Sequence, residues 1–432
     1  MDLVIRNACL RGKDGLWDIA VENKKFAAIL PKILGNGKKE IDAQGNLMLP
    51  PFGDPHLHLD AVLCSGEPRY NMSGGLLEGI QIWGERKKYH NKEMIRHNAL
   101  EVIKWEVAHG VLHIRGHLDA TDPHLLGLET LLEIKDQVKD IVNLQLSAFP
   151  QDGIFTNPNG AAQLEKCLKM GADCVGGAPH LEMTYLDGVR DIQFVFDLAE
   201  KYDRIVDIHV DETADGNSRF IEYMCKEAVS RGMEGLVSAS HITAMDQYNN
   251  DYAFKIIGNL KRADINVITN PTSNSACENR LEGYPKHRAL ARVNDLLERG
   301  VNVTIANDSV MNPWHILGQS NLLHTANLLA HYGHMNGFTQ IKKMIDMITY
   351  NSAKTFLIQD DYGIDVGKNA DFIVLDAKNE IDAVRLCSEC LYVVKEGKII
   401  VETIPAKRSL HFREDVELVD MKIKPYPSKV KF

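Results

Sequence analysis

The segment PFGDPHLHLD occupies residues 51–60 and follows an apolar stretch near residue 50. Residues two apart on a β-strand project from the same face, so His56 and His58 can present two imidazoles to one metal ion if this segment is the first strand of a barrel. The chain contains 17 histidines, however, and two of them can fall close together on a surface by chance. The pattern therefore needs support from elsewhere in the chain.

Seven further apolar runs follow this segment and alternate with helical patterns. They span residues 111–114, 141–146, 172–175, 204–208, 235–239, 265–268 and 301–305. Strands separated by helices indicate right-handed parallel βαβ units, and eight such units predict an α/β fold, the (β/α)8 TIM barrel. The catalytic residues of such a barrel lie at the C-terminal ends of its strands.

The two ends of the chain differ from this middle part, because both contain short strand patterns and turns. The strand patterns include residues 3–5, 18–21, 370–375, 391–394 and 397–401. We therefore predict a small β-sandwich domain formed from both termini, with its arms at residues 1–48 and 361–432. The barrel domain between the two arms spans residues 49–360.

Composition limits the partners and the compartment. The formal net charge is −10, and no block of like charge or basic stripe occurs, which argues against nucleic acid and anionic membranes as partners. The opening residues lack a basic segment, and no apolar run is long enough to span a membrane. The eight cysteines, including the lone pair Cys387 and Cys390, suggest neither a disulfide framework nor a zinc site. We expect a cytoplasmic protein.

Histidines and acids occur at the predicted C-terminal ends of four barrel strands. Strand one ends in His56 and His58, strand five in His209 and Glu212, strand six in His241, and strand eight in Asp308. One histidine at a strand end is more often a structural residue than a ligand. Four strand ends with matching chemistry indicate a single site at the mouth of the barrel.

This pattern and its neighbouring motifs resemble the amidohydrolase superfamily, and within it the cytosine deaminase family. The motifs are residues 51–60, AFPQDG at 148–153, HVDE at 209–212, SHITAM at 240–245, YPK at 284–286 and NDSVMNPWHIL at 307–317. The similarity covers nearly the whole chain, including both arms of the β domain. It implies a metal-dependent hydrolytic deaminase that converts an aminopyrimidine base, cytosine or 5-methylcytosine, to uracil or thymine and ammonia.

The resemblance implies that one divalent ion, iron or zinc, is held by four residues: His56, His58, His209 and Asp308. Three imidazoles and a carboxylate suit a first-row metal, and an open coordination position is typical of a catalytic site. Many relatives in the superfamily hold two metals bridged by a carboxylated lysine on strand four. Residues 171–177 contain no lysine, so we predict one metal ion per chain.

The resemblance also assigns three catalytic roles. Glu212 resembles the proton shuttle of the family, although a solvated loop acid is the ordinary alternative. His241 resembles the residue that orients or deprotonates the attacking water. Asp308 can accept a proton from that water in addition to binding the metal.

Four further positions resemble substrate contacts. Gln151 has an amide that matches a ring edge with a C=O beside an N–H, whereas an ordinary turn is the alternative. Trp314 would cover the flat ring, and Leu76, in the loop after strand one, resembles a contact position. Typical cytosine deaminases carry a second aspartate near the C5 edge of the pyrimidine, where this chain has Ser309. The loss of that carboxylate predicts that the site accepts a 5-methyl group.

Other functions remain open at this point. The unrelated zinc deaminases use H-x-E with P-C-x-x-C; residues 180–182 match only the first half, and Cys387 follows leucine, so we reject this class. A non-catalytic metal-binding protein is disfavoured by the presence of Glu212 and His241. Another cyclic amidine, such as isoguanine, isocytosine or creatinine, is the main alternative substrate. We expect a small nucleobase as the ligand and a homo-oligomer as the assembly.

Overall fold

The computed structural model describes residues 1–412 and 415–422 and contains two compact units. One unit is formed by Met1–Pro51 and the chain from Asp360 onwards, and the other is formed by Phe52–Gln359. Part of the predicted C-terminal arm, residues 413–414 and 423–432, lies outside the described residues. Among the helices of the described part, none is both long and apolar enough to cross a membrane.

The eight predicted barrel strands are present and pair in parallel in chain order. They are β6 (Phe52–Leu57), β7 (Val111–Asp119), β8 (Asn143–Phe149), β9 (Cys174–Val175), β10 (Ile205–Val210), β11 (Val237–His241), β12 (Asn266–Thr269) and β13 (Val303–Ile305). Strand β7 extends beyond the predicted run 111–114. Its second half contains polar residues, among them Arg115 and His117, which are buried as fully as its apolar residues. The apolar pattern in the sequence therefore ends before the strand does.

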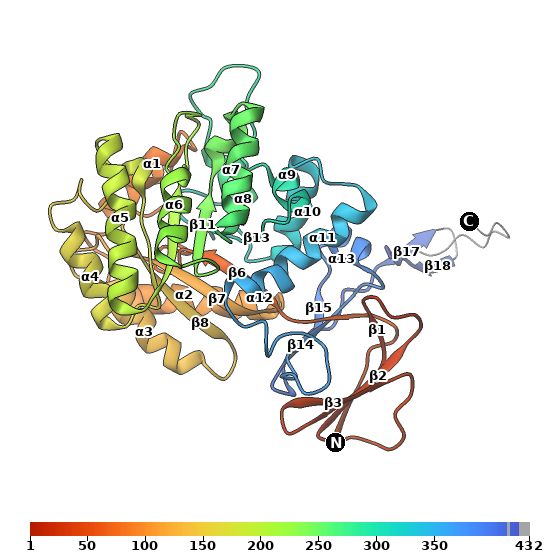
Figure 1. The fold of residues 1–432 in the computed structure, drawn as a ribbon. Helices are drawn as coiled ribbons and strands as arrows, with labels where there is room; N and C mark the ends of the chain where they lie inside the picture. Colours follow the sequence, from red (N-terminus) through yellow and green to blue (C-terminus); the bar gives the residue numbers. More distant parts are fainter. Residues whose placement is uncertain (413–414, 423–432) are drawn as a thin grey trace. The chain divides into compact units, whose positions relative to one another are not determined.

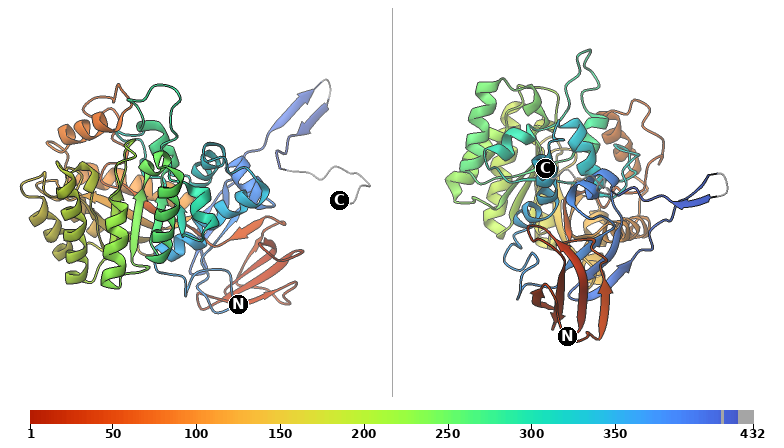
Figure 2. Two further views of the ribbon diagram at one scale, coloured as in Figure 1. Left: turned by 45° about the horizontal axis from the view of Figure 1, so that its top comes forward. Right: turned by 90° about the vertical axis from the view of Figure 1, so that its right-hand side faces the viewer.

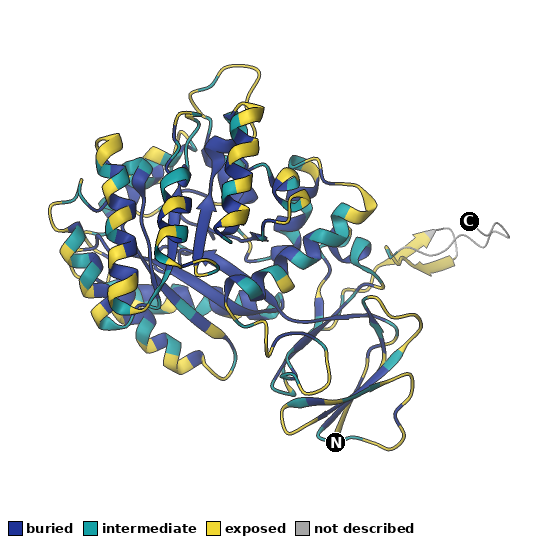
Figure 3. Cartoon of the chain, in the orientation of Figure 1, coloured by how far each residue is buried: buried dark blue, intermediate teal, exposed yellow. Residues whose placement is uncertain are grey.

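Helices surround the barrel strands (Figure 1). They are α1 (Leu76–Arg86), α2 (Lys92–Ala108), α3 (Leu126–Val138), α4 (Gly160–Met170), α5 (Tyr185–Tyr202), α6 (Ile221–Arg231), α7 (Asn250–Arg262), α8 (Pro271–Cys277), α9 (Val293–Glu298), α10 (Leu322–Tyr332), α11 (Phe338–Ile348) and α12 (Tyr350–Thr355), with 3-10 turns η1 (Pro179–Leu181) and η2 (Thr243–Gln247). Side chains of Asn91, Thr184 and Asn249 cap α2, α5 and α7. The strands are buried whereas the outer helix faces are exposed, as expected for a parallel sheet covered by helices (Figure 3).

The first and last barrel strands meet at the mouth of the barrel and nearly close it. Leu57 and Asp308 form a parallel bridge. The amide of His58 donates to the carbonyl of Asp308 at 3.0 Å, and the amide of Asp308 donates to the carbonyl of His56 at 2.8 Å. Asp308 and His241 both adopt left-handed backbone conformations, with φ of 63° and 73°. Aspartate and histidine adopt positive φ more readily than most residues other than glycine, so these two strand ends can turn there.

The unit formed from both termini contains one mixed sheet in the order β16-β15-β14-β5-β1-β2-β3, with β4 paired to β1. The strands are β1 (Leu3–Leu10), β2 (Trp17–Glu22), β3 (Lys25–Leu30), β4 (Lys39–Asp42), β5 (Leu47–Leu49), β14 (Phe372–Leu375), β15 (Cys390–Lys395) and β16 (Lys398–Glu402), with helix α13 (Glu380–Leu386) and a hairpin of β17 (Ser409–Phe412) and β18 (Asp415–Leu418). Figure 2 shows β1, β2 and β3 side by side. The core of this unit includes Ile5, Ile19 and Phe372, so residues from both ends of the chain pack together. All eight cysteines are free.

Candidate active site

Three histidines and one aspartate converge at the mouth of the barrel. The Nε2 atoms of His58 and His209 lie 3.3 Å apart, and Asp308 Oδ1 lies 3.3 Å from His58 Nε2 and 3.5 Å from His56 Nε2. Metal bonds of about 2.0–2.1 Å at tetrahedral angles place ligand atoms about 3.3 Å from one another. All four side chains are buried. The donor set and its spacing therefore fit a divalent metal ion.

A network of hydrogen bonds between buried polar groups orients the His56 ring. Its Nδ1 lies 2.9 Å from Ser240 Oγ, which in turn donates to Asp207 Oδ1 at 3.2 Å. Because the Ser240 proton points to Asp207, the Ser240 oxygen can accept from His56 Nδ1–H. His56 Nε2 has no hydrogen-bond partner among the described residues, so its lone pair is available to a metal. Arg115 extends this network by donating a hydrogen bond to Asp207 Oδ2 at 2.7 Å.

Aromatic stacking orients two of the ligand rings. His209 stacks on Phe149 with ring centroids 3.8 Å apart, and His56 stacks on His117 with centroids 3.9 Å apart. His117 Nε2 lies 3.4 Å from Asp207 Oδ2. Burial acts to raise the pKa of Asp207, but the neighbouring His117 and Arg115 hold this pKa below its ordinary value. A carboxylate therefore remains ionised beside His56 and His117, where it can support the candidate metal ligands.

Glu212 and His241 face each other beside this cluster. Glu212 Oε1 lies 3.3 Å from His241 Nδ1 and accepts from Asn274 Nδ2 at 3.3 Å. Burial, with added repulsion from Glu278 and Asp308, raises the pKa of Glu212 well above its ordinary value. Burial lowers the pKa of His241 to about 4. The pair therefore consists of a carboxylic acid that can donate a proton and a neutral imidazole that can accept one.

The residue before Glu212 explains why its side chain faces the pocket. Asp211 has a left-handed backbone, with φ of 53°. Its buried carboxylate accepts hydrogen bonds from Ser218 Oγ at 2.7 Å and from the amides of Phe220 at 3.0 Å and Ile221 at 3.1 Å. These bonds tie the end of β10 to the start of α6. Of two adjacent acids at this strand end, Asp211 is thus structural and Glu212 is free for chemistry.

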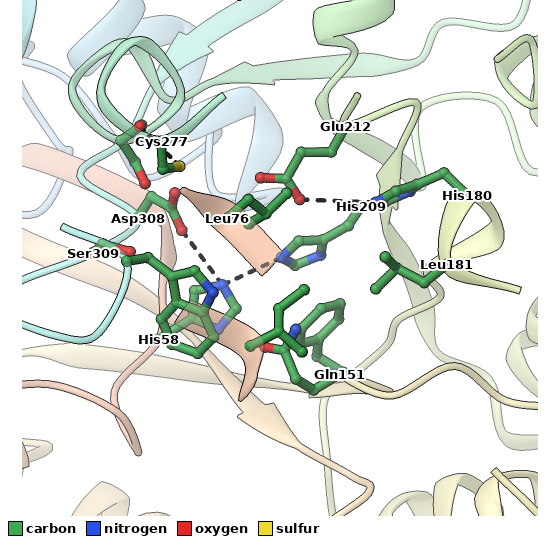
Figure 4. A pocket seen from close by; sticks show the side chains of 14 residues that line it. His58, Leu76, Gln151, His180, Leu181, His209, Glu212, Cys277, Asp308 and Ser309 are labelled. Atoms are coloured by element: carbon green, nitrogen blue, oxygen red, sulfur yellow. Dashed lines mark hydrogen bonds and ion pairs between the residues drawn. The ribbon is translucent and has the colours of Figure 1, made fainter. Parts of the chain in front are cut away.

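A pocket covers the cluster (Figure 4). Its lining includes His58, His209, Asp308, Glu212, Gln151, Ser309, Trp314, Leu76, His180, Leu181, Phe149, Ile80, Ser273 and Cys277. All four predicted substrate contacts therefore lie at the pocket. Leu76 was expected in a loop, but it is the first residue of helix α1. Trp314 packs so closely on Gly79 of this helix that a Cβ there would lie 2.5 Å from its ring, which holds the helix against the pocket.

Several residues of the site were not predicted from the sequence. His117 lies on β7, whose polar half was not recognised as strand, although its position two residues after Arg115 is a period-two signal. His180 follows the two-residue strand β9 by five positions, so no strand end pointed to it. Asn274 lies on α8 and carries an amide, whereas the pattern at the strand ends consists of histidines and acids. Each of these residues was found from its contacts.

Comparisons with known proteins agree with this geometry. A family model, the amidohydrolase family, matches residues 39–401. The crystal structure of 5-methylcytosine deaminase from Klebsiella pneumoniae liganded with 5-fluorocytosine is 40% identical, with a TM-score of 0.91, and covers 95% of this chain and 99% of that chain. The same deaminase liganded with phosphonocytosine has a TM-score of 0.90. N-isopropylammelide isopropyl amidohydrolase from Pseudomonas sp. (strain ADP) is 29% identical over 411 residues, which are 93% of this chain and 97% of the relative.

The chain therefore belongs to the amidohydrolase family. Within that family it is a hydrolase similar to the cytosine deaminases.

Proposed function

We propose that the protein is a metal-dependent deaminase that hydrolyses cytosine and 5-methylcytosine to uracil and thymine with release of ammonia. The observation that carries this proposal is the arrangement of one pocket, in which Glu212 and Gln151 lie around a buried His/Asp cluster. The similarity to 5-methylcytosine deaminase supports the choice of substrate. A homo-oligomeric state and a cytoplasmic location stay predictions.

The side chains suggest a division of roles. His56, His58, His209 and Asp308 would hold one ion, iron or zinc, which when bound supplies an acidified water for attack on the ring. His241, a neutral imidazole, accepts a proton from the attacking water, and Asp308 helps to orient that water. Glu212 donates its proton to the ring nitrogen next to the attacked carbon. The resulting carboxylate then takes the proton of the hydroxyl added at that carbon and passes it to the departing amine, and the proton held by His241, 3.3 Å from Glu212, restores the acid. Gln151 binds the carbonyl edge, while Trp314 excludes bulk water.

We expect about one equivalent of metal per chain, because the three possible metal-binding groups of the described residues all share His56 and β9 with its flanking residues 171–177 provides no lysine to bridge a second ion. Elemental analysis of active protein measures this ratio. Chelation should abolish activity, and the return of one equivalent of iron or zinc should restore it. Two tightly bound ions, both needed for activity, would contradict the proposal.

Ser309 is expected to make 5-methylcytosine a substrate comparable to or better than cytosine. It is buried beside Asp308 at the pocket. Burying one methyl contributes only about 0.8 kcal/mol, or about fourfold. A carboxylate pressed against that methyl would lose hydration at a cost of about 1–3 kcal/mol. Ser309→Asp should therefore lower kcat/KM for 5-methylcytosine relative to cytosine by about 5-fold to 150-fold.

The control for this prediction is Ser309→Asn, which has nearly the size of aspartate but no charge. This variant should shift the ratio of the two kcat/KM values less than Ser309→Asp does. If wild-type protein strongly prefers cytosine, or if Ser309→Asp leaves the ratio unchanged, Ser309 has no role at the C5 edge.

Ammonia release separates the proposed substrates from the other cyclic amidines. We expect turnover of cytosine and 5-methylcytosine to exceed that of isocytosine, isoguanine and creatinine. A higher kcat/KM for one of these three compounds would contradict the proposed substrate class while leaving the hydrolytic chemistry intact.

A further inference from the structure

His180 is a buried polar residue at the pocket with no internal partner. It lies in η1, and only 5% of its side chain is exposed. Neither of its ring nitrogens makes a hydrogen bond to another residue in the described part of the chain. Buried polar side chains are almost always hydrogen-bonded. An unsatisfied imidazole that lines a pocket therefore indicates that the pocket ligand supplies its partner.

The imidazole lies next to the acid of the catalytic pair. His180 Nε2 is 4.0 Å from Glu212 Oε2, which is too long for a hydrogen bond. An imidazole carries at least one N–H in either protonation state, so the His180 ring can donate a hydrogen bond to a ligand in the pocket.

The order of side chains around the pocket matches the order of atoms around a pyrimidine. In Figure 4, Glu212, His180, Leu181 and Gln151 follow one another along one wall, and Ser309 lies on the other side beside Asp308. In cytosine, the attacked C4 is followed by N3, the C2 carbonyl and N1–H, with C5 on the opposite side of C4. With C4 at the cluster, N3 at Glu212 and N1–H at Gln151, the C2 carbonyl points to the wall at His180.

We propose that His180 binds the C2 carbonyl oxygen of the substrate by donating a ring N–H to it. This inference rests on the proposed function. The carbonyl oxygen has two lone pairs, and the amide of Gln151 can satisfy only the one on the N1 side. The ring N–H of His180 donates a hydrogen bond to the lone pair on the N3 side. Attack at C4 moves electron density through N3 towards this oxygen, so a donor there binds the substrate and also stabilises the reacting ring.

His180→Phe tests the inference, because it keeps a planar ring and removes the N–H. Two product-like ligands provide the readout: uracil carries the C2 carbonyl, whereas 4-pyrimidinone lacks it. By calorimetry with metal-loaded protein, we expect His180→Phe to weaken uracil binding about tenfold or more and 4-pyrimidinone binding less than threefold. The kcat/KM for cytosine and for 5-methylcytosine should fall by similar factors, since both bases carry the same carbonyl.

Two further variants separate binding from structure. His180→Gln retains an N–H donor and should recover part of the lost uracil affinity. Leu181→Val changes the neighbouring wall without altering hydrogen bonds and should affect uracil and 4-pyrimidinone equally. If His180→Phe does not fold, His180→Leu replaces it in the same comparison, with metal content and circular dichroism as checks on the fold.

The possible outcomes are distinct. Equal losses for uracil and 4-pyrimidinone would overturn the inference and assign His180 a structural role, and unchanged uracil binding would also overturn it. Both results are compatible with an active pyrimidine deaminase. A wild-type protein that releases ammonia from neither base would instead overturn the proposed function itself.

Discussion

Glu212→Gln is expected to lower kcat by a factor on the order of 10² to 10⁴ while the metal stays bound. Glutamine has nearly the same shape and can keep the contact with Asn274, but it cannot donate and regain a proton as a carboxylic acid does. Glu212 belongs to none of the possible metal-binding groups of the described residues and contacts His241 and Asn274, so the loss should appear in kcat without a matching loss of metal. Steady-state kinetics together with elemental analysis of the variant measure both quantities.

The matched control is Asp215→Asn, which removes a carboxylate from an exposed position three residues further along the same loop. This substitution should leave kcat within about twofold, because the hydrogen bonds that the carboxylate makes in the described part of the chain go to Asn217 in its own turn. A Glu212→Gln variant with nearly wild-type kcat would remove Glu212 from the mechanism.

Arg115→Met is expected to destabilise the barrel by about 3–5 kcal/mol. The Arg115 side chain is fully buried and donates to Asp207 at 2.7 Å, to Ser238 at 3.1 Å, to Gln145 at 3.1 Å and to the carbonyl of Thr355 at 2.8 Å. Removing the guanidinium leaves the Asp207 charge buried with little compensation. Chemical denaturation of the metal-loaded protein measures the loss as a lower transition midpoint.

The control for this effect is Arg96→Met, which removes an arginine whose side chain is 34% exposed and pairs with Glu133. Exposed ion pairs contribute about 0–1 kcal/mol, so this variant should unfold nearly as the wild type does. If the two variants unfold at the same denaturant concentration, the buried ion pair contributes little to stability. Because Asp207 also supports His56 through Ser240, Arg115→Met should weaken metal binding as well.

The barrel strands could be predicted because parallel strands buried on both faces read as continuous apolar runs. The same reasoning placed every strand but not every strand end. The predicted run 172–175 is paired only at Cys174–Val175, and β7 continues to Asp119 because it buries His113, Arg115, His117 and Asp119 among its apolar residues. Charged and imidazole groups inside a barrel are favourable only with partners from other strands, as Arg115 has in Asp207. Local patterns do not contain that information.

The sequence by itself determined the candidate metal ligands. His56 and His58 follow from the period of two along a strand, and His209 and Asp308 follow from their positions at strand ends and from the family resemblance. Tertiary structure alone decided which neighbouring residues form hydrogen bonds to these ligands and which buried polar groups lack a hydrogen-bond partner. Pairing of β6 with the segment after β13 brings Asp308 to the histidines, although the two lie some 250 residues apart in the chain. The partner of His56 and the unpaired state of His180 likewise depend on contacts between distant strands and turns, which no spacing along the chain specifies.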